Sequence, residues 1–286
     1  MGTPRRTLRD AFRLERPVPP TPASRWLRRL ILLTALVVIV VEAMNVYVTD
    51  EPGFSLFVRS SWALLRVIAF LFLMRAVRYG RAVARPFGLI LAVTTVFAVA
   101  RLTEPRTGSL LPRTEVLVGI GVLAALCTAV VLLLYKSSAV DEHLSARPVR
   151  RHVPGWLLTA RVAVLSFAPL VLIPLLVGVG TLFGDERRHP FPATVGLLVV
   201  WGVLLLVTAY LIPVGSFFVI VGKGWARWLV GAVSVLVLAL QPALCYAVLG
   251  LDGLLRDGVP LIVTAILALV ALHRSRGLPT WIRPVP

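Results

Sequence analysis

The feature that most constrains this chain is a series of long apolar runs that carry almost no charge. Soluble helices alternate apolar and polar faces, but here valine, leucine, alanine and isoleucine continue through each run without a polar face. The mean hydropathy is +0.89. Only 15% of the residues are charged, against about 25% in soluble proteins. Such runs are stable in lipid, so the sequence predicts a multi-pass membrane protein.

We predict eight membrane-spanning helices. A bilayer core about 30 Å thick needs about 20 residues of helix. Apolar runs of suitable length occur at 26–48, 54–76, 86–102, 115–135, 156–183, 192–220, 226–249 and 259–273. The third and eighth runs are short, and Pro169, Pro174 and Pro213 predict bends in the fifth and sixth. The expected fold class is an all-α polytopic membrane protein.

The positions of arginine and lysine predict how the chain is oriented. With the N-terminus in the cytoplasm, most of the 30 basic residues fall in cytoplasmic segments. The opposite side then holds only Arg59, Arg101, Arg106, Arg113, Arg187, Arg188 and Arg256. Cytoplasmic segments of membrane proteins carry an excess of lysine and arginine. We therefore predict a protein of the cell (inner or plasma) membrane with both termini in the cytoplasm.

This distribution also accounts for the net charge of +17. The basic residues are spread over short cytoplasmic segments, and none is long enough to form a folded nucleic-acid-binding face. We expect them to attract anionic lipid headgroups instead, and we expect no nucleic-acid partner. The sequence leaves open a protein partner or a homo-oligomer.

A ladder of small residues lies in the fourth span, at Gly121, Ala125 and Ala129. Such ladders let helix backbones approach closely in lipid. We expect this ladder to pack within the chain; the alternative is a homodimer face.

Two similar loops indicate an internal repeat. Residues 80–85 (Gly-Arg-Ala-Val-Ala-Arg) precede the third span, and residues 222–227 (Gly-Lys-Gly-Trp-Ala-Arg) precede the seventh. We predict two four-helix repeats, at 26–136 and 156–274, which are parallel because each contains an even number of spans. The alternative is that any two short basic loops before a helix look alike.

Three segments lie outside the repeats. Residues 1–25 are basic and rich in proline, a composition typical of a disordered cytoplasmic tail. Residues 137–155 form a polar cytoplasmic linker between the repeats, and residues 275–286 form a second cytoplasmic tail.

Each repeat resembles a known group of proteins. A basic loop of this type leading into an apolar span, with a last span closed by Tyr-Lys-Ser-Ser (135–138) or His-Arg-Ser-Arg (273–276), is similar to small uncharacterised four-span membrane proteins of high-GC bacteria. The chain looks like two such units fused. The resemblance implies no activity.

The sequence contains no recognisable catalytic or metal-binding motif. All four histidines lie in loops or at the end of a span, and no Cys/His spacing suits a metal. The glycine-rich phosphate loop of ATPases is missing. We therefore expect no metal and no cofactor, and the sequence favours a protein that is not an enzyme.

Glu42 and Arg66 are the candidates for a site inside the membrane. The rise of a helix puts both near mid-membrane, in neighbouring spans. Charges at this depth are costly and are expected to pair, and Asn45 is expected to donate to the Glu42 carboxylate. Either the pair fastens the first two spans together, or Glu42 exchanges protons or binds a cationic substrate.

Trp201 and Gln241 are weaker candidates. Trp201 lies near the middle of the sixth span, where it either contacts lipid or packs against other helices; the alternative is a ring that faces a substrate. Gln241 precedes Pro242 in the seventh span. This pair predicts a local helix break with exposed carbonyls, or a simple kink.

We first interpret the chain as a non-enzymatic accessory, scaffold or envelope-organising protein. The alternative is a small-molecule or lipid transporter that uses Glu42 and Arg66. A transporter requires a polar cavity between the halves at mid-membrane depth, whereas a scaffold is expected to have a dry centre.

Overall fold

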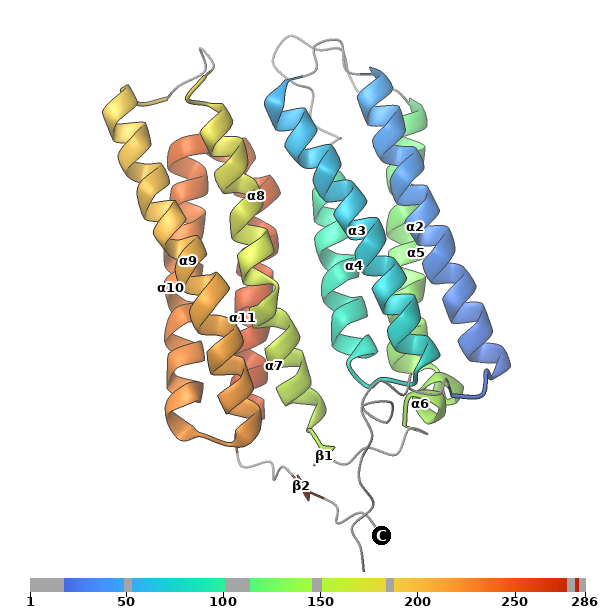
Figure 1. Cartoon of the computed structure of the whole chain (residues 1–286). Helices are drawn as coiled ribbons and strands as arrows, with labels where there is room; N and C mark the ends of the chain where they lie inside the picture. Colours follow the sequence, from blue (N-terminus) through green and yellow to red (C-terminus); the bar gives the residue numbers. More distant parts are fainter. Residues whose placement is uncertain are drawn as a thin grey trace, which may run out of the picture.

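A computed structural model of the chain describes residues 18–48, 53–100, 114–145, 151–183, 188–276 and 281–282. They form long helices that run up and down past one another (Figure 1). In chain order the elements are α2 (Pro22–Val48), α3 (Phe54–Arg78), α4 (Ala84–Ala100), α5 (Thr114–Lys136), α6 (Ser138–Ser145), β1 (Arg151–His152), α7 (Gly155–Leu165), α8 (Phe167–Gly180), α9 (Phe191–Val221), α10 (Gly224–Gly253), the π-helix η2 (Leu254–Gly258), α11 (Val259–Arg274) and β2 (Trp281–Ile282).

The helices have the length and composition of membrane spans. Seven apolar stretches are long enough to cross a membrane: α2, α3, α5, α7 with α8, α9, α10, and η2 with α11. The remaining predicted span corresponds to α4, which has 17 residues. In lipid only a helix satisfies every backbone polar group within one segment, which explains why these apolar runs are helical. The predicted all-α polytopic class is confirmed.

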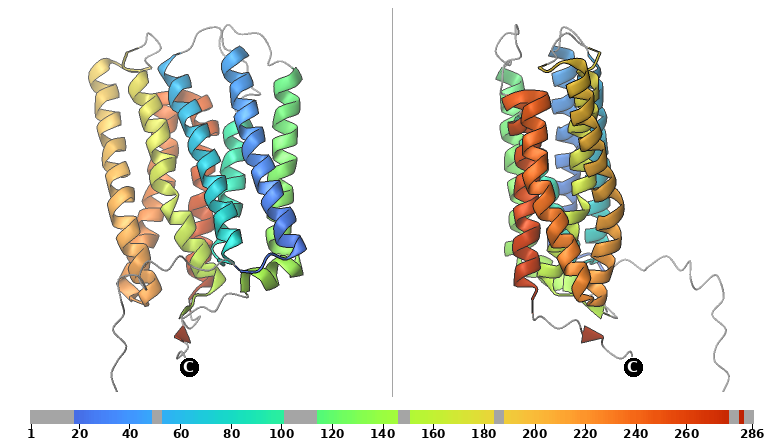
Figure 2. Two further views of the ribbon diagram at one scale, coloured as in Figure 1. Left: turned by 45° about the vertical axis from the view of Figure 1, so that its right-hand side comes forward. Right: turned by 90° about the vertical axis from the view of Figure 1, so that its left-hand side faces the viewer.

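The described residues form two helix bundles, each with its own apolar core. One core joins residues of α2 to α6, from Leu27 to Leu144, and the other joins residues of α7 to α11, from Leu157 to Leu272. Only Ile90 of α4 belongs to the core of the second bundle. The two bundles stand side by side, so that a view along their row shows a molecule only about as wide as one bundle (Figure 2).

Both bundles have the same cyclic order of neighbours. In the first, α2 packs against α3 and α5, and α4 packs against the same two helices. In the second, α7 and α8 together form one span that packs against α9 and α11, and α10 packs against the same two. The bundles meet where α3 and α4 contact α8, α7, α11 and η2.

Gly80 and Gly222 end α3 and α9 in the same way. Each has a positive φ, 61° and 90°. After each glycine the next amide donates five residues back, Arg81 N to Ala76 O and Lys223 N to Phe218 O. This is the Schellman pattern of helix ends, which favours glycine because the left-handed conformation strains other residues. The two loops that look alike in sequence therefore begin with the same backbone turn.

The short helix α6 closes one end of the first bundle, which we call the α6 end. The Arg85 side chain donates from Nε to the carbonyl of Leu134, 3.1 Å away, and its Nη2 pairs with Asp141 of α6. The buried His143 ring bonds through Nε2 to the carbonyl of Val77 at 3.0 Å. The described strands β1 and β2, an antiparallel pair, lie toward the same end (Figure 1).

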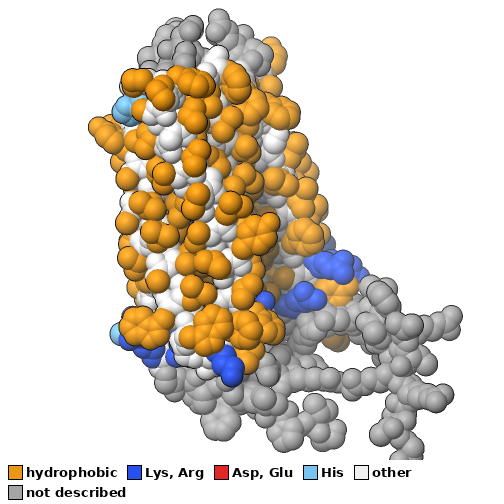
Figure 3. All heavy atoms as spheres, turned by 60° about the vertical axis from the view of Figure 1, so that its left-hand side comes forward, with side chains coloured by type: hydrophobic (Ala, Val, Ile, Leu, Met, Phe, Trp, Pro, Cys, Tyr) orange, Lys and Arg blue, Asp and Glu red, His pale blue; other side chains and the backbone are white. Residues whose placement is uncertain are grey.

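The outer surface is apolar along the helices and basic at the α6 end. Figure 3 shows hydrophobic side chains over the length of the bundles, with lysine and arginine gathered toward the lower end. Trp26, Trp225 and Trp228 are exposed near the same end of their helices. Arg29 stacks over Trp26 at 5.4 Å. Tryptophan and basic side chains both favour the level of lipid headgroups.

The prolines expected to bend or break the spans have different outcomes in the structure. The fifth span does break, since α7 ends at Leu165 and α8 begins at Phe167, just before Pro169. However, α10 continues as helix through Pro242, and its backbone departs from helical geometry only at Gly250 (φ 78°, ψ −165°). Of the two alternatives for Gln241 and Pro242, the helix break is therefore wrong, whereas the simple kink stays a prediction. Helix α9 likewise continues through Pro213.

The small-residue ladder of α5 faces outward. Gly121 and Ala125 are exposed, and a Cβ added at Gly121 would have no atom within 4 Å. The expectation that this ladder packs within the chain is wrong for these residues. Instead, Leu123 and Cys127 on another face of α5 enter the first core.

Candidate functional site

A polar cavity lies between the two bundles. About 440 Å³ there is not filled by atoms, and this volume includes space open to the surroundings of the protein. Its lining comes from α3 and α4 of the first bundle and from α8, η2 and α11 of the second: Arg59, Trp62, Arg66, Thr94, Ala98, Leu170, Ile173, Pro174, Arg256, Asp257 and Pro260. Three arginines and one aspartate within an otherwise apolar contact between helices make this the candidate site, which we call the arginine cavity.

Arg59 and Arg66 reach the cavity because they lie on one face of α3. Seven residues make nearly two helical turns, so the two side chains project in the same direction about 10 Å apart along the axis. Arg66 lies about 18 Å from the first residue of α3, near the middle of the 25-residue helix. Trp62 lies one turn from each and lines the cavity between them.

Among the residues that the structure describes, Arg59 makes the only ion pair between the bundles. Its Nη2 lies 3.4 Å from Oδ2 of Asp257, and both side chains are largely buried. The other terminal nitrogen, Nη1, is buried without a hydrogen-bond partner among the described residues. Leaving such a donor unsatisfied costs about 1–3 kcal/mol.

Arg66 is a buried cation that makes no ion pair with another described residue. It is 4% exposed, and its Nε has no hydrogen-bond partner among the described residues. Glu42 and Asp257 both attract it electrostatically. However, the ion pairs within 4 Å between described residues are Arg59–Asp257 and Arg85–Asp141, and neither includes Arg66. A charge at this depth is a functional candidate because it costs so much to bury.

Glu42 belongs to a hydrogen-bonded cluster on α2 and α3. Ser60 Oγ donates to Glu42 Oε1 at 2.8 Å, and Asn45 Nδ2 donates to the same oxygen at 3.2 Å. The structure therefore brings Glu42 and Asn45 together, with Ser60 as the bonded residue from α3. Arg66 feels the charge of Glu42 without a direct ion pair within 4 Å, and it faces the cavity between the bundles.

The second bundle contributes Arg256 and Asp257 through a special piece of backbone. Both residues lie in η2, a single π-helical stretch between α10 and α11. Just before it, Gly250 has a positive φ, and a Cβ there would lie 2.1 Å from the guanidinium of Arg188. π-Helical insertions are frequent at functional sites because they redirect side chains from the regular helical face.

Trp201 and Gln241 also come together, but inside the second bundle. The Trp201 ring is 0% exposed, and its Nε1 donates to Gln241 Oε1 at 2.7 Å. Gln241 Nε2 in turn donates to the Cys245 sulfur at 3.5 Å. The ring packs in the core and does not contact lipid, and neither residue lines the arginine cavity.

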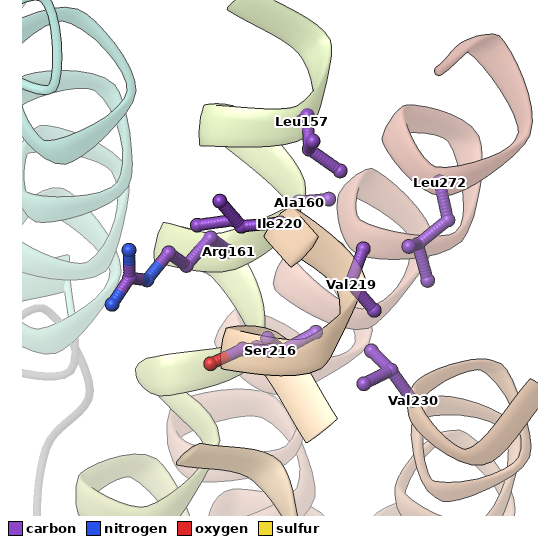
Figure 4. A pocket seen from close by; sticks show the side chains of 9 residues that line it. Leu157, Ala160, Arg161, Ser216, Val219, Ile220, Val230 and Leu272 are labelled. Carbon is purple, nitrogen blue, oxygen red and sulfur yellow. The ribbon is translucent and has the colours of Figure 1, made fainter. Parts of the chain in front are cut away.

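A second, smaller cavity of about 210 Å³ lies within the second bundle, near the α6 end. Figure 4 shows that its lining is mostly aliphatic, from α7, α9, α10 and α11. Arg161 borders it, but the guanidinium extends away from the cavity toward the first bundle (Figure 4). Apart from Ser216, no uncharged polar side chain lines this cavity. Nothing in its lining would recognise a polar ligand.

Sequence reasoning missed most of the arginine cavity. Arg59 lies near the outer end of the predicted span 54–76, whereas Arg256 and Asp257 fall in the predicted loop between the last two spans. The structure places them in α3 and η2, where all three line the arginine cavity. The spacing of seven between Arg59 and Arg66 within one apolar run was an available signal of a shared basic face. The pairing with η2 had no such signal, since 198 residues separate Arg59 from Asp257.

Comparisons with protein families, with curated proteins and with solved structures find no match to this chain. Among the described residues, no group of three or more His, Cys, Asp or Glu side chains is placed to hold a metal ion. The arginine cavity is therefore assessed from its own chemistry.

Proposed function

We propose that this integral membrane protein is a transporter of a small molecule or lipid, and that its substrate passes through the arginine cavity. The observation that carries the proposal is a polar cavity between the two bundles that includes Arg66, near the middle of a membrane-spanning helix. Transporters commonly bind their substrates near mid-membrane, between structural repeats that move against each other.

The geometry changes the substrate expected from the sequence. Glu42 accepts hydrogen bonds from Ser60 and Asn45 and does not line the cavity. The lining has three cationic side chains and one carboxylate. An anionic substrate therefore suits the site better than the cationic one that Glu42 alone suggested.

The contact between the bundles supports movement of one against the other. Each bundle has a separate apolar core, so each is stabilised mainly from within. Near the cavity the contact is a small cluster of Val58, Ile173 and Val177 with the Arg59–Asp257 pair beside it. The cavity can open between the bundles when a few contacts of this kind break. Disruption of either apolar core would instead unfold a bundle.

The alternative is a non-enzymatic accessory, scaffold or envelope-organising protein. The dry cores of the individual bundles favour it, but a purely structural contact has no need for two buried arginine nitrogens without partners. We also propose the cell membrane as the location, with the basic α6 end and both termini in the cytoplasm.

Accessibility of the cavity from the two sides of the membrane tests this proposal. In a chain carrying Cys127→Ala and Cys245→Ala, Thr94→Cys places one thiol on the cavity lining. For a transporter, a membrane-impermeant thiol reagent labels this cysteine from either side, because the cavity opens alternately. Labelling from one side only, or from neither, contradicts transport and favours the scaffold.

Thr128→Cys is the matched control. Thr128 is exposed on α5 and lies outside the cavity lining. In a bilayer this position faces lipid, so we expect no labelling by the impermeant reagent from either side.

A further inference from the structure

We propose that the arginine cavity recognises a phosphate group, carried either by an anionic phospholipid or by a small water-soluble phosphate. This inference rests on the proposed function, since it names the substrate class of the same cavity. The argument has three parts: the donors, the charge and the walls.

The donors suit phosphate. Arg59, Arg66 and Arg256 present planar guanidinium groups from two different bundles. Guanidinium groups bind phosphate oxygens through paired, charge-assisted hydrogen bonds, which makes arginine the preferred residue for this anion. Arg59 Nη1 and Arg66 Nε are buried with no hydrogen-bond partner among the described residues, so two donors on α3 are unsatisfied in this structure.

The charge suits an anion with one negative charge. Three arginines line the cavity against one carboxylate, Asp257. Glu42 adds a second negative charge that acts on Arg66 from α2. The three arginines and the two carboxylates leave one positive charge in excess around Arg66, which a phosphodiester would neutralise.

Asp257 already forms an ion pair with one of the arginines, Arg59, in this structure. Its carboxylate contacts Nη2 of Arg59 from across the contact between the bundles. An incoming phosphate would compete with this carboxylate for Arg59. Binding is thereby linked to loosening of the only described ion pair between the bundles, which ties ligand recognition to the movement that transport requires.

The walls beside the arginines are largely apolar. The rest of the lining includes Ala98, Leu170, Ile173 and Pro174, which offer apolar contact to the carbon groups of a phosphate ester. A phospholipid headgroup that enters near Arg59 would have to move about 10 Å along α3 to reach Arg66. The two arginines thus mark successive positions for one phosphate.

The test is a binding measurement on the full-length protein. Wild type, Arg66→Gln, Arg66→Lys and the control Arg161→Gln are purified in detergent. Each is probed separately with phosphatidylglycerol, phosphatidylcholine, glycerol 3-phosphate, inorganic phosphate and oleate. Arg161 is a matched control because it is an arginine inside a span that does not line the arginine cavity. Retention of lipid is read by native mass spectrometry, and soluble ligands by calorimetry.

We expect Arg66→Gln to weaken phosphate binding about ten- to hundredfold, the effect of losing charged hydrogen bonds. Arg66→Lys should retain part of the binding, and Arg161→Gln should match wild type. Binding of phosphatidylglycerol alone identifies a lipid headgroup as the source; binding of glycerol 3-phosphate or inorganic phosphate identifies a soluble one. Both outcomes support a phosphate site.

Two outcomes would overturn the inference. One is equal phosphate binding by wild type and Arg66→Gln, and the other is binding of oleate or phosphatidylcholine in preference to every anionic phosphate. Arg66→Lys keeps the test valid if Arg66→Gln fails to fold. This measurement does not depend on access from two sides of a membrane. Phosphate binding with one-sided labelling of Thr94→Cys would therefore sustain the phosphate site and reject transport.

Discussion

Arg59 and Asp257 join the two bundles through a 3.4 Å contact between residues 198 positions apart in the chain. Both belong to the lining of the arginine cavity, so this ion pair links the two bundles at the site itself. A buried pair of this kind adds little net stability over apolar packing, but the loss of one partner is costly because the other charge stays buried.

Asp257→Ala should therefore destabilise the protein while improving anion binding. Removal of the carboxylate leaves the Arg59 charge buried and uncompensated, at a cost of about 3–5 kcal/mol. The midpoint of thermal unfolding in detergent should fall, and added phosphate ligand should restore more of it than in wild type.

The double variant Arg59→Gln with Asp257→Ala is the control for this pair. It removes both charges, so its unfolding midpoint should lie above that of Asp257→Ala alone. A double variant that is less stable by the full sum of both single changes would show that the two residues do not act as a pair.

Trp201→Phe tests a separate polar contact in the second bundle. The change removes the donor to Gln241 Oε1 and leaves that amide buried, since Gln241 is 0% exposed. We expect a loss of about 1–3 kcal/mol, seen as a lower unfolding midpoint. Phosphate binding should not change, because neither residue lines the arginine cavity.

Gln241→Leu provides the matched comparison. Combined with Trp201→Phe it removes both polar groups, so the double variant should be more stable than the sum of the single effects predicts. Altered phosphate binding in Trp201→Phe would instead connect this pair to the site.

The spans were predictable from sequence because each is an uninterrupted apolar run. A helix in lipid needs no tertiary partner to satisfy its backbone, so the local composition sets its position within a few residues. The predicted 54–76 and 192–220 thus correspond to α3 (Phe54–Arg78) and α9 (Phe191–Val221). Features of a helix that depend on its contacts with other parts of the chain were harder to predict from the sequence. For example, the backbone of α10 departs from helical geometry at Gly250, where Arg188 packs against it.

The candidate site was predictable only in part, for a physical reason. Glu42 and Asn45 lie one turn apart on one helix, so their contact follows from the local sequence. The partners of Arg66 depend on how the bundles pack, and the sequence of α3 alone does not determine this. Lipid-facing and buried surfaces are both apolar in a membrane protein, which removes the pattern that marks a core in water.

Gly250→Ala should destabilise the second bundle and displace η2. Its φ of 78° with ψ of −165° suits only glycine, and residues forced into such regions cost about 1–3 kcal/mol. The new methyl group would also meet the Arg188 guanidinium. Because η2 carries Arg256 and Asp257, phosphate binding should weaken together with the unfolding midpoint.

Gly231→Ala is the control within the same helix. A Cβ at Gly231 meets no atom within 4 Å, and alanine favours helix over glycine by up to about 1 kcal/mol. This variant should be as stable as wild type or more so. Similar losses in both variants would show that α10 tolerates no added methyl group, and would remove the special role of Gly250.

Glu42→Gln distinguishes fastening from a charge-dependent role. The amide oxygen of glutamine can still accept from Ser60 and Asn45, so these two bonds can persist, and any fall in the unfolding midpoint should come from the lost attraction to Arg66. Loss of the negative charge near Arg66 should strengthen phosphate binding several-fold, because an attracting carboxylate no longer competes for Arg66. Ser60→Ala, which breaks the helix-to-helix bond, should cost about 1 kcal/mol. Unchanged phosphate binding in Glu42→Gln would separate Glu42 from the cavity.

The last prediction concerns orientation. A reporter fused after residue 150 should report the cytoplasm, and one placed near residue 186 should report the outside. The α6 end carries Arg75, Arg78 and Lys136 in the last turns of α3 and α5, and basic helix ends stay in the cytoplasm. Position 150 follows α6, whereas position 186 lies between α8 and α9 at the other ends of these helices. An external signal at 150 would contradict both this orientation and the eight-span topology. It would also place the end of α3 that carries Arg59 on the cytoplasmic side. A phospholipid that enters near Arg59 would then come from the opposite leaflet.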